Sequence, residues 1–199
     1  MKGKWAHGLE PRGFRWVITD RLAASERPGG YGRNHRRVRR DEEIQWLVQQ
    51  QFTLILSLLP SPHNLKAYRD RALKYKRIEI GAPADRPRHL QAIYLTLREW
   101  LSETDERILI HHATIDDELC GAIAGYLLWA GYLEKPSHAI IAVEQLMGRQ
   151  LGSLGRNVVA LSAEISTDPP ESFDVSDVIL DDDLSVVLDD DVELLLPDS

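Results

Sequence analysis

The sequence contains a single cysteine, Cys120, among 199 residues. One thiol excludes an intramolecular disulfide framework, and no cysteine and histidine residues follow zinc-finger spacing. Long hydrophobic runs are also missing: residues 119–133 are too few and too rich in glycine to cross a bilayer, and residues 1–14 have no apolar stretch typical of a secretory signal. We therefore expect a cytoplasmic protein without membrane contact, and we expect no cofactor.

Basic residues are absent from the last part of the chain. Residues 164–199 contain 13 acidic residues and no basic ones, so a net charge of -7 for the whole chain leaves +6 for residues 1–163. The tail repeats approximately, as "DVILDDDL" and then "SVVLDDDV", with an apolar triplet beside three aspartates. We predict a folded domain over 1–163 and a disordered acidic tail over 164–199. This tail either increases solubility or binds a protein partner as a linear motif.

Arginines cluster in the stretch "GRNHRRVRR". The five arginines are Arg33, Arg36, Arg37, Arg39 and Arg40. Such a cluster is either a solvated loop or a binding site for nucleic acid, anionic lipid, a phosphorylated partner or the acidic tail of the same chain. Apart from Tyr31, aromatic residues do not interleave with these arginines, and the acidic tail would compete with nucleic acid. We therefore favour a protein partner or a contact between tail and body over nucleic acid.

Apolar periodicity predicts strands that alternate with helices. Strands are expected at 14–19, 52–60, 75–80 and 107–112, and helices at 42–51, 64–73, 88–103, 119–133 and 137–152. Asp41 is the expected N-cap of the first helix, after a loop that extends through Arg40. The runs "FTLILSLLP" and "RILIHH" are continuously apolar, which is typical of buried parallel strands. The expected fold class is α/β, a mainly parallel sheet flanked by helices.

The stretch 107–133, "RILIHHATIDDELCGAIAGYLLWAGYL", has the layout of an anion-binding loop. A buried strand ends in a loop that enters a helix rich in small residues, so loop amides and the helix N-terminus converge on one point. The simplest local interpretation is different: a histidine pair ends the strand, and Asp116 or Asp117 interacts with the helix N-terminus.

Five stretches together resemble bacterial members of the dual-specificity, protein-tyrosine-phosphatase-like family. In order they are "WVITDRLAASERPGG", "FTLILSLLPSPHNLKAY", "YKRIEIGAPADRP", a long helix and "ILIHHATIDDELCGAIAGYLLWAGY", within residues 13–152. The family signature is His-Cys, five residues, then Arg. His111 matches its first histidine, but the nucleophilic cysteine falls on His112 and the arginine on Glu118. The resemblance thus implies a phosphatase fold without the thiolate and guanidinium of the reaction.

Other residues do not restore this chemistry. Cys120 lies in the predicted helix and has Tyr126 six positions further on instead of arginine. Exchanging arginine for Glu118 turns attraction for a phosphate dianion into repulsion, to which Asp116 and Asp117 add. We hypothesise that one loop carboxylate accepts the amides that would hold phosphate. The expected function is a catalytically inactive, phosphatase-like binding or regulatory module.

Two alternatives keep an enzymatic function. His112 could act as the nucleophile of a divergent phosphatase and form a phosphohistidine, given cationic groups around the phosphoryl oxygens. Alternatively, His112 with Asp116 or Glu118 could hold a divalent metal within the 111–118 loop. The sequence leaves open whether a metal binds there. The resemblance also implies a general acid after the strand at 75–80. Asp85 is the only candidate there, unless it is simply an exposed loop aspartate.

Overall fold

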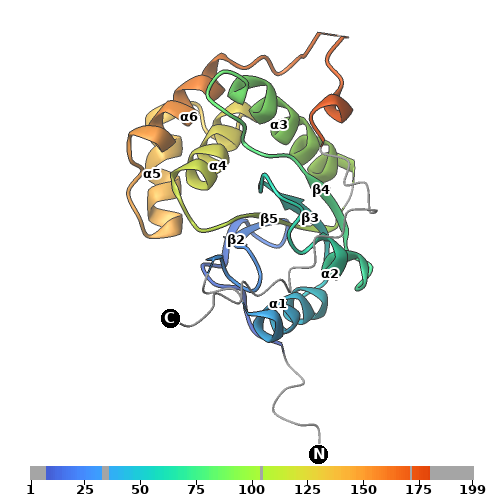
Figure 1. The fold of residues 1–199 in the computed structure, drawn as a ribbon. Helices are drawn as coiled ribbons and strands as arrows, with labels where there is room; N and C mark the ends of the chain where they lie inside the picture. The colour runs from blue at the N-terminus through green and yellow to red at the C-terminus, as the bar shows by residue number, and fades with distance from the viewer. Residues whose placement is uncertain (1–7, 33–35, 104, 171, 180–199) are drawn as a thin grey trace, which may run out of the picture.

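The computed structural model describes residues 8–32, 36–103, 105–170 and 172–179, and its centre is a five-stranded sheet (Figure 1). The strands are β1 (Arg15–Ile18), β2 (Leu22–Glu26), β3 (Phe52–Ser57), β4 (Lys74–Arg77) and β5 (Arg107–His112), in the order β1-β2-β5-β3-β4. β1 is antiparallel to β2, and the other neighbouring pairs are parallel. The predicted fold class, a mainly parallel sheet with flanking helices, is confirmed.

The helices cover both faces of this sheet. They are α1 (Arg37–Gln49), α2 (Leu65–Arg69), α3 (Arg86–Glu103), α4 (Asp117–Trp129), α5 (Pro136–Met147), α6 (Ser153–Glu164) and the short 3-10 helix η2 (Val175–Asp177). In Figure 1, α3 to α6 lie on one side of the sheet, and α1 and α2 lie on the other. A parallel sheet covered in this way has strands that are buried on both faces.

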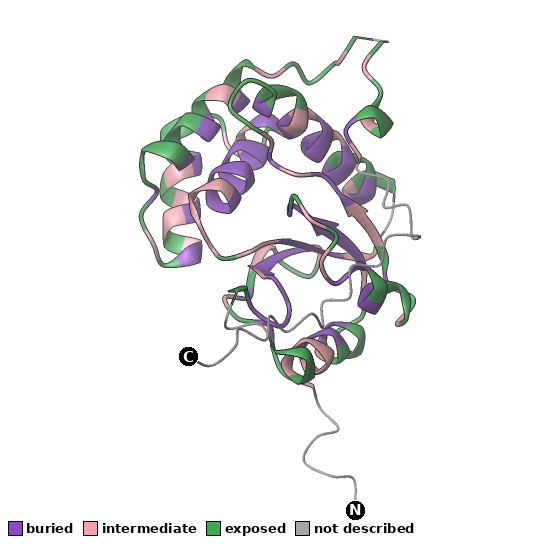
Figure 2. Cartoon of the chain, in the orientation of Figure 1, coloured by how far each residue is buried: buried purple, intermediate pink, exposed green. Residues whose placement is uncertain are grey.

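β5 shows why its sequence is continuously apolar. Ile108 and Ile110 pack in the hydrophobic cluster with α3 and α4, whereas Leu109 packs in the second cluster with α1 and α2. Successive side chains of a strand point to opposite faces, so both faces of β5 need apolar residues. Figure 2 shows the buried residues concentrated along the sheet and on the helix faces toward it.

Helix α1 begins earlier than its sequence predicts. Its N-cap is Arg36, so the prediction of Asp41 as N-cap is wrong. The amide of Arg36 donates to the carbonyl of Gly29, and the buried carboxylate of Glu43 accepts the Gly29 amide at 2.7 Å. Both contacts involve Gly29, which precedes the helix. The residues near the helix start therefore give no local signal of where it begins.

Three elements lie outside the predicted set: β2, α6 and η2. β2, "LAASE", falls in the predicted loop because its small residues show no alternation, and it is a strand through its position between β1 and β5. The helix expected over 137–152 ends at Met147, since Gly148 adopts the left-handed conformation with φ 65°, and α6 follows as a separate helix. α2 and β4 are also shorter than predicted, at 65–69 and 74–77.

The chain continues to pack on the body after α6. The carbonyl of Ser166 accepts from the indole of Trp129 at 3.2 Å, and Arg88 pairs with Asp177 at 2.8 Å. Val178 is only 5% exposed and belongs to the cluster around α3. The first part of the predicted acidic tail therefore contacts α3, while residues 180–199 lie outside the described residues. Across the described part of the chain, no helix combines the length and hydrophobicity needed to span a membrane.

The close contact between α4 and α6 depends on Gly125. A Cβ at this position would meet the hydroxyl groups of Ser162 and Tyr94, which hydrogen-bond to each other at 2.6 Å. We expect Gly125→Ala to lower the free energy of unfolding by about 2 kcal/mol through overpacking, although alanine is the better helix former. Urea denaturation measures this. The double variant Gly125→Ala/Ser162→Gly should lose less free energy of unfolding than the two single variants lose in sum, because glycine at 162 removes the hydroxyl that the new methyl group would meet. A Gly125→Ala protein as stable as the wild type would contradict the observed packing.

Candidate functional site

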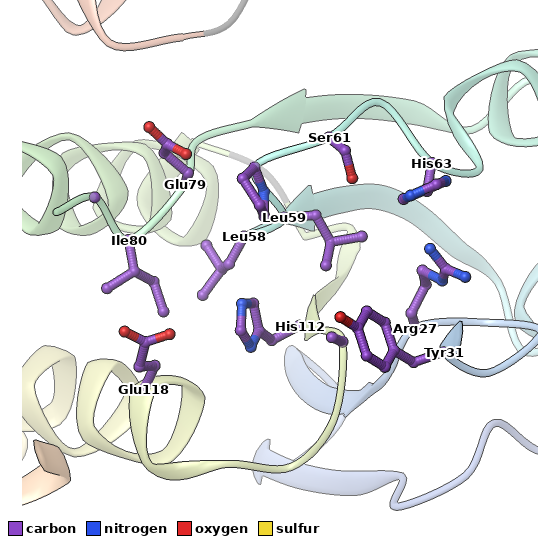
Figure 3. Close-up of a pocket in the computed structure, with 13 residues that line it drawn as sticks. Arg27, Tyr31, Leu58, Leu59, Ser61, His63, Glu79, Ile80, His112 and Glu118 are labelled. Atoms are coloured by element: carbon purple, nitrogen blue, oxygen red, sulfur yellow. The ribbon is translucent and has the colours of Figure 1, made fainter. Parts of the chain in front are cut away.

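A pocket of about 440 Å³ lies where β2, β3, β4 and β5 end (Figure 3). Ligands of open parallel sheets gather at this edge because the strand ends and the following loops converge there. The carbonyl of His112 accepts from the Arg27 amide at 2.8 Å, and that of His111 accepts from the Leu58 amide at 2.9 Å. The end of β5 thereby positions the loops on both sides. The lining residues are Arg27, Tyr31, Leu58, Leu59, Pro60, Ser61, His63, Glu79, Ile80, Gly81, His112, Ala113 and Glu118.

His112 is held by a carboxylate of its own loop. Its Nδ1 lies 2.7 Å from Oδ2 of Asp116, the N-cap of α4, whose Oδ1 accepts the Leu119 amide at 3.0 Å. Burial raises the pKa of Asp116, but the hydrogen bonds from His112 and Leu119 outweigh it and hold the pKa below its usual value. Since an ionised carboxylate only accepts, Nδ1 of His112 carries the proton, and Nε2 is its other nitrogen in the pocket. The bond from the Leu119 amide to Asp116 supports, for one amide, the hypothesis that a loop carboxylate accepts the amides that would hold phosphate.

Asp117 is tied to a different element. Its Oδ1 accepts from Nη2 of Arg149 at 2.7 Å, and Nη1 of the same arginine donates to the carbonyl of Ile115 at 3.0 Å. Arg149 follows α5, so it connects the loop before α4 to the turn between α5 and α6. Asp117 consequently faces α6 and does not line the pocket.

Glu118 pairs with an arginine that the sequence analysis did not single out. Nη2 of Arg86, in the first turn of α3, lies 3.0 Å from its carboxylate. The Arg86 side chain is 9% exposed and that of Glu118 29%, so the pair is largely shielded from solvent. The charge of Glu118 is thus compensated within the protein, which weakens the repulsion of phosphate that the sequence predicts.

His111 supports the fold beneath the pocket. It is fully buried, and its Nε2 lies 3.0 Å from the hydroxyl of Tyr68. Burial lowers the pKa of His111 to about 3, with His112 and Arg27 acting in the same direction. It is therefore neutral at ordinary pH and belongs to the core.

The remaining sequence candidates lie away from the pocket. Asp85 is exposed just before α3 and is not among the residues that line the cavity. Burial raises the pKa of Cys120 to about 11, so this thiol is not a nucleophile. Among the residues that the structure describes, no group of three or more histidine, cysteine, aspartate or glutamate side chains is arranged to hold a metal. His112 and Asp116 form only a pair, and Glu118 binds Arg86 instead.

The predicted arginine cluster lies mainly on helix α1. Arg36 is its N-cap, and Arg37, Arg39 and Arg40 are helical instead of lying in a loop, because α1 begins four residues before Asp41. Arg39 pairs with the buried Glu43 at 2.7 Å, whereas Arg36 and Arg37 are exposed. Arg33 lies outside the described residues.

Arg27 and His63 are pocket residues that the sequence analysis did not identify. Arg27 is only 4% exposed, donates from Nε to the carbonyl of Gly30 at 2.8 Å, and lies 5.9 Å from the Tyr31 ring centroid. In Figure 3, Arg27 and Tyr31 come from the loop after β2, His63 comes from the loop after β3, and His112 ends β5. Only the tertiary fold brings them together, so no spacing in the sequence indicates them.

Solved phosphatase structures share this fold. The active form of Tk-PTP aligns with a TM-score of 0.60 at 17% identity, covering 76% of this chain and 97% of the other. Kinase-associated phosphatase with its catalytic cysteine replaced by serine gives 0.66 and 17%, with 80% and 98% covered. The catalytic core of the S. cerevisiae PP-IP phosphatase Siw14 gives 0.57 and 16%, with 77% and 86% covered. No family model and no curated protein sequence matches the chain. The chain thus has a protein-tyrosine-phosphatase-like fold.

The neutral state of His111 predicts a pH dependence of stability. The unfolded chain binds a proton at His111 near pH 6.5, while the folded chain resists protonation until about pH 3. The contribution of His111 to the free energy of unfolding is therefore complete above about pH 6.5 and decreases as the pH falls from there toward about 3. We expect His111→Gln to be less stable at pH 7 but to lose less stability between about pH 6.5 and 4.5. Urea melts across this range test it, with exposed His138→Gln as control; equal slopes for His111→Gln and wild type would contradict the assignment.

Proposed function

We propose that this protein keeps a phosphatase-like fold without cysteine-based phosphatase chemistry and acts as a binding or regulatory module. One observation carries this proposal: the residues at the nucleophile and arginine positions of the loop are both bound to other side chains of the protein. His112 stands in the nucleophile position and is bound to Asp116. Glu118 stands in the arginine position and is bound to Arg86.

The charges around the pocket support this proposal. A phosphate dianion needs free amides and a bidentate guanidinium, but Asp116 accepts the Leu119 amide at the N-terminus of α4. Glu118 and Arg86 compensate each other, so Arg27 and Glu79 are the other oppositely charged residues of the lining. The lining therefore has no excess of arginine over carboxylate that would favour a dianion.

A protein is the partner class that we favour. Tyr31 and Val38 are 59% and 72% exposed, and they accompany the exposed Arg36 and Arg37 at the beginning of α1. Aromatic and arginine side chains are enriched in protein interfaces. The acidic tail is the other proposed contact, and it makes nucleic acid a poor ligand. A cytoplasmic location is part of the same proposal.

A second candidate function is phosphoester hydrolysis with His112 as the nucleophile. The contact between Nδ1 and Asp116 favours it, since this contact fixes the ring and leaves the Nε2 lone pair for attack on phosphorus. The phosphoryl group would move to Nε2 while the ester oxygen leaves with the bonding electrons, and water would later release phosphate. Arg27 is the guanidinium in the pocket that could stabilise the transferred group.

Turnover of p-nitrophenyl phosphate by wild type and His112→Ala separates the two functions. We expect no turnover above that of buffer for either protein, with a chelator present or with Mg²⁺, Mn²⁺ or Zn²⁺ added, because the thiolate and the loop guanidinium are replaced. His138→Ala, on the exposed start of α5, serves as the matched control. Turnover that His112→Ala abolishes and His138→Ala retains would overturn the inactive-module proposal.

If turnover is present, Asp116→Asn tests whether the His112 contact matters for it. An amide at 116 can present its NH2 group to Nδ1 of His112, so the ring is no longer held with Nε2 free for attack and turnover should fall. Turnover that stays unchanged in this variant would exclude a role for the His112–Asp116 pair in catalysis.

A further inference from the structure

A second pocket, of about 420 Å³, lies at the other end of α4 from the first. Helices α3, α4 and α6 pack together on one side of the sheet (Figure 1), and the pocket is formed where α3 and α4 end and the chain leaves α6. Along α4, about 16 Å of helix separates Trp129, which lines this pocket, from Glu118 in the pocket at the strand ends. The two pockets are therefore separate sites.

Three aromatic rings, those of Tyr126, Trp129 and Tyr132, form an aromatic wall in this second pocket. The ring centroids of Tyr126 and Trp129 are 6.4 Å apart, and that of Tyr132 lies 6.2 Å from Tyr126. Gly131 is in the left-handed conformation with φ 77°, which ends α4 and brings Tyr132 back beside Tyr126. Tyr132 is 53% exposed, so part of the wall is open to a ligand. Such a wall favours a planar aromatic ring, which packs on its neighbours in an offset or edge-to-face arrangement.

Arg98 is the charged residue among the described residues that line this pocket. Its guanidinium carbon lies 5.0 Å from the Trp129 ring centroid, and its Nη1 donates to the carbonyl of Thr167 at 2.7 Å. These contacts hold the guanidinium in place, which lowers the entropy cost of binding a ligand. Within the ranges that the structure describes, no carboxylate pairs with Arg98. Its other N–H groups therefore fit the two oxygens of a ligand carboxylate.

The Tyr126 hydroxyl is a second donor for such a ligand. Tyr126 is 1% exposed and lines the pocket, and its hydroxyl has no hydrogen-bond partner in the described part of the chain. Burial raises the pKa of Tyr126, Tyr132 acts in the same direction, and the Arg98 guanidinium lowers it. The phenol is therefore neutral and lies within electrostatic reach of Arg98. Since an unpaired buried donor costs free energy, a ligand oxygen that accepts from it is favoured.

We propose that this second pocket binds a small aromatic carboxylate. The ring of the ligand lies against the aromatic wall, and its carboxylate accepts hydrogen bonds from Arg98 and from the Tyr126 hydroxyl. One guanidinium matches the single charge of a carboxylate better than the two charges of a phosphate. The proposal goes beyond the proposed function and does not depend on it, because the site does not include the loop at 111–118.

Isothermal titration calorimetry of the full-length chain with indole-3-acetate tests this proposal. We expect one site with a Kd of about 0.1 mM, which is usual for a ligand of this size. Indole-3-acetamide has the ring without the charge and should bind about tenfold more weakly. Cyclohexaneacetate has the charge without an aromatic ring and should bind about fivefold more weakly. Equal affinity for the acid and its amide, or no saturation by the acid at about 5 mM, would overturn the proposal.

Tyr126→Phe removes only the hydroxyl. We expect it to bind indole-3-acetate about fivefold more weakly but to keep the stability of the wild type in urea, because this hydroxyl has no partner in the described protein. Tyr94→Phe is the matched control: its ring lies 5.8 Å from that of Tyr126, and its hydroxyl bonds Ser162 at 2.6 Å. This control should lose stability and keep the affinity.

Arg98→Gln should weaken binding of the acid about tenfold and leave binding of the amide almost unchanged. Wild-type affinity for the acid in either Tyr126→Phe or Arg98→Gln would overturn the proposed site. Loss of binding in His112→Ala would also overturn it, since the ligand would then lie in the pocket at the strand ends. None of these readouts involves turnover, so failure here is distinct from failure of the proposed function.

Discussion

The carboxylate of Asp116 joins the end of the central strand to the beginning of the core helix. One oxygen accepts from the ring of His112 on β5, and the other accepts the Leu119 amide of α4. A helix N-terminus favours negative charge. Here a side chain of the same loop supplies that charge at the N-terminus of α4.

The other two acids extend this arrangement to distant parts of the chain. Asp117 binds Arg149 after α5, and Glu118 binds Arg86 at the start of α3. Three consecutive carboxylates would repel one another if they faced one space. Each instead has a partner from a different direction, so the cluster acts as three separate attachments of the loop to the body.

The sequence was sufficient for the fold class, because the continuous apolar runs of β3 and β5 are local information. The partners of the loop carboxylates were not predictable. Arg86 and Arg149 each lie 32 residues from their partners, Glu118 and Asp117, and carry no local signal of their role. β2 was missed for a similar reason. Its identity as a strand comes from pairing with β1 and β5, and small buried residues give no alternation.

The pairing of Glu118 with Arg86 has a consequence for the substitutions that this loop tolerates. Arginine at 118 would place a second guanidinium beside Arg86, whose side chain is 9% exposed and would lose its carboxylate partner. A change at 118 alone therefore leaves a largely buried charge uncompensated. Position 118 on α4 and position 86 on α3 are thus mutationally coupled, although they lie 32 residues apart in the chain.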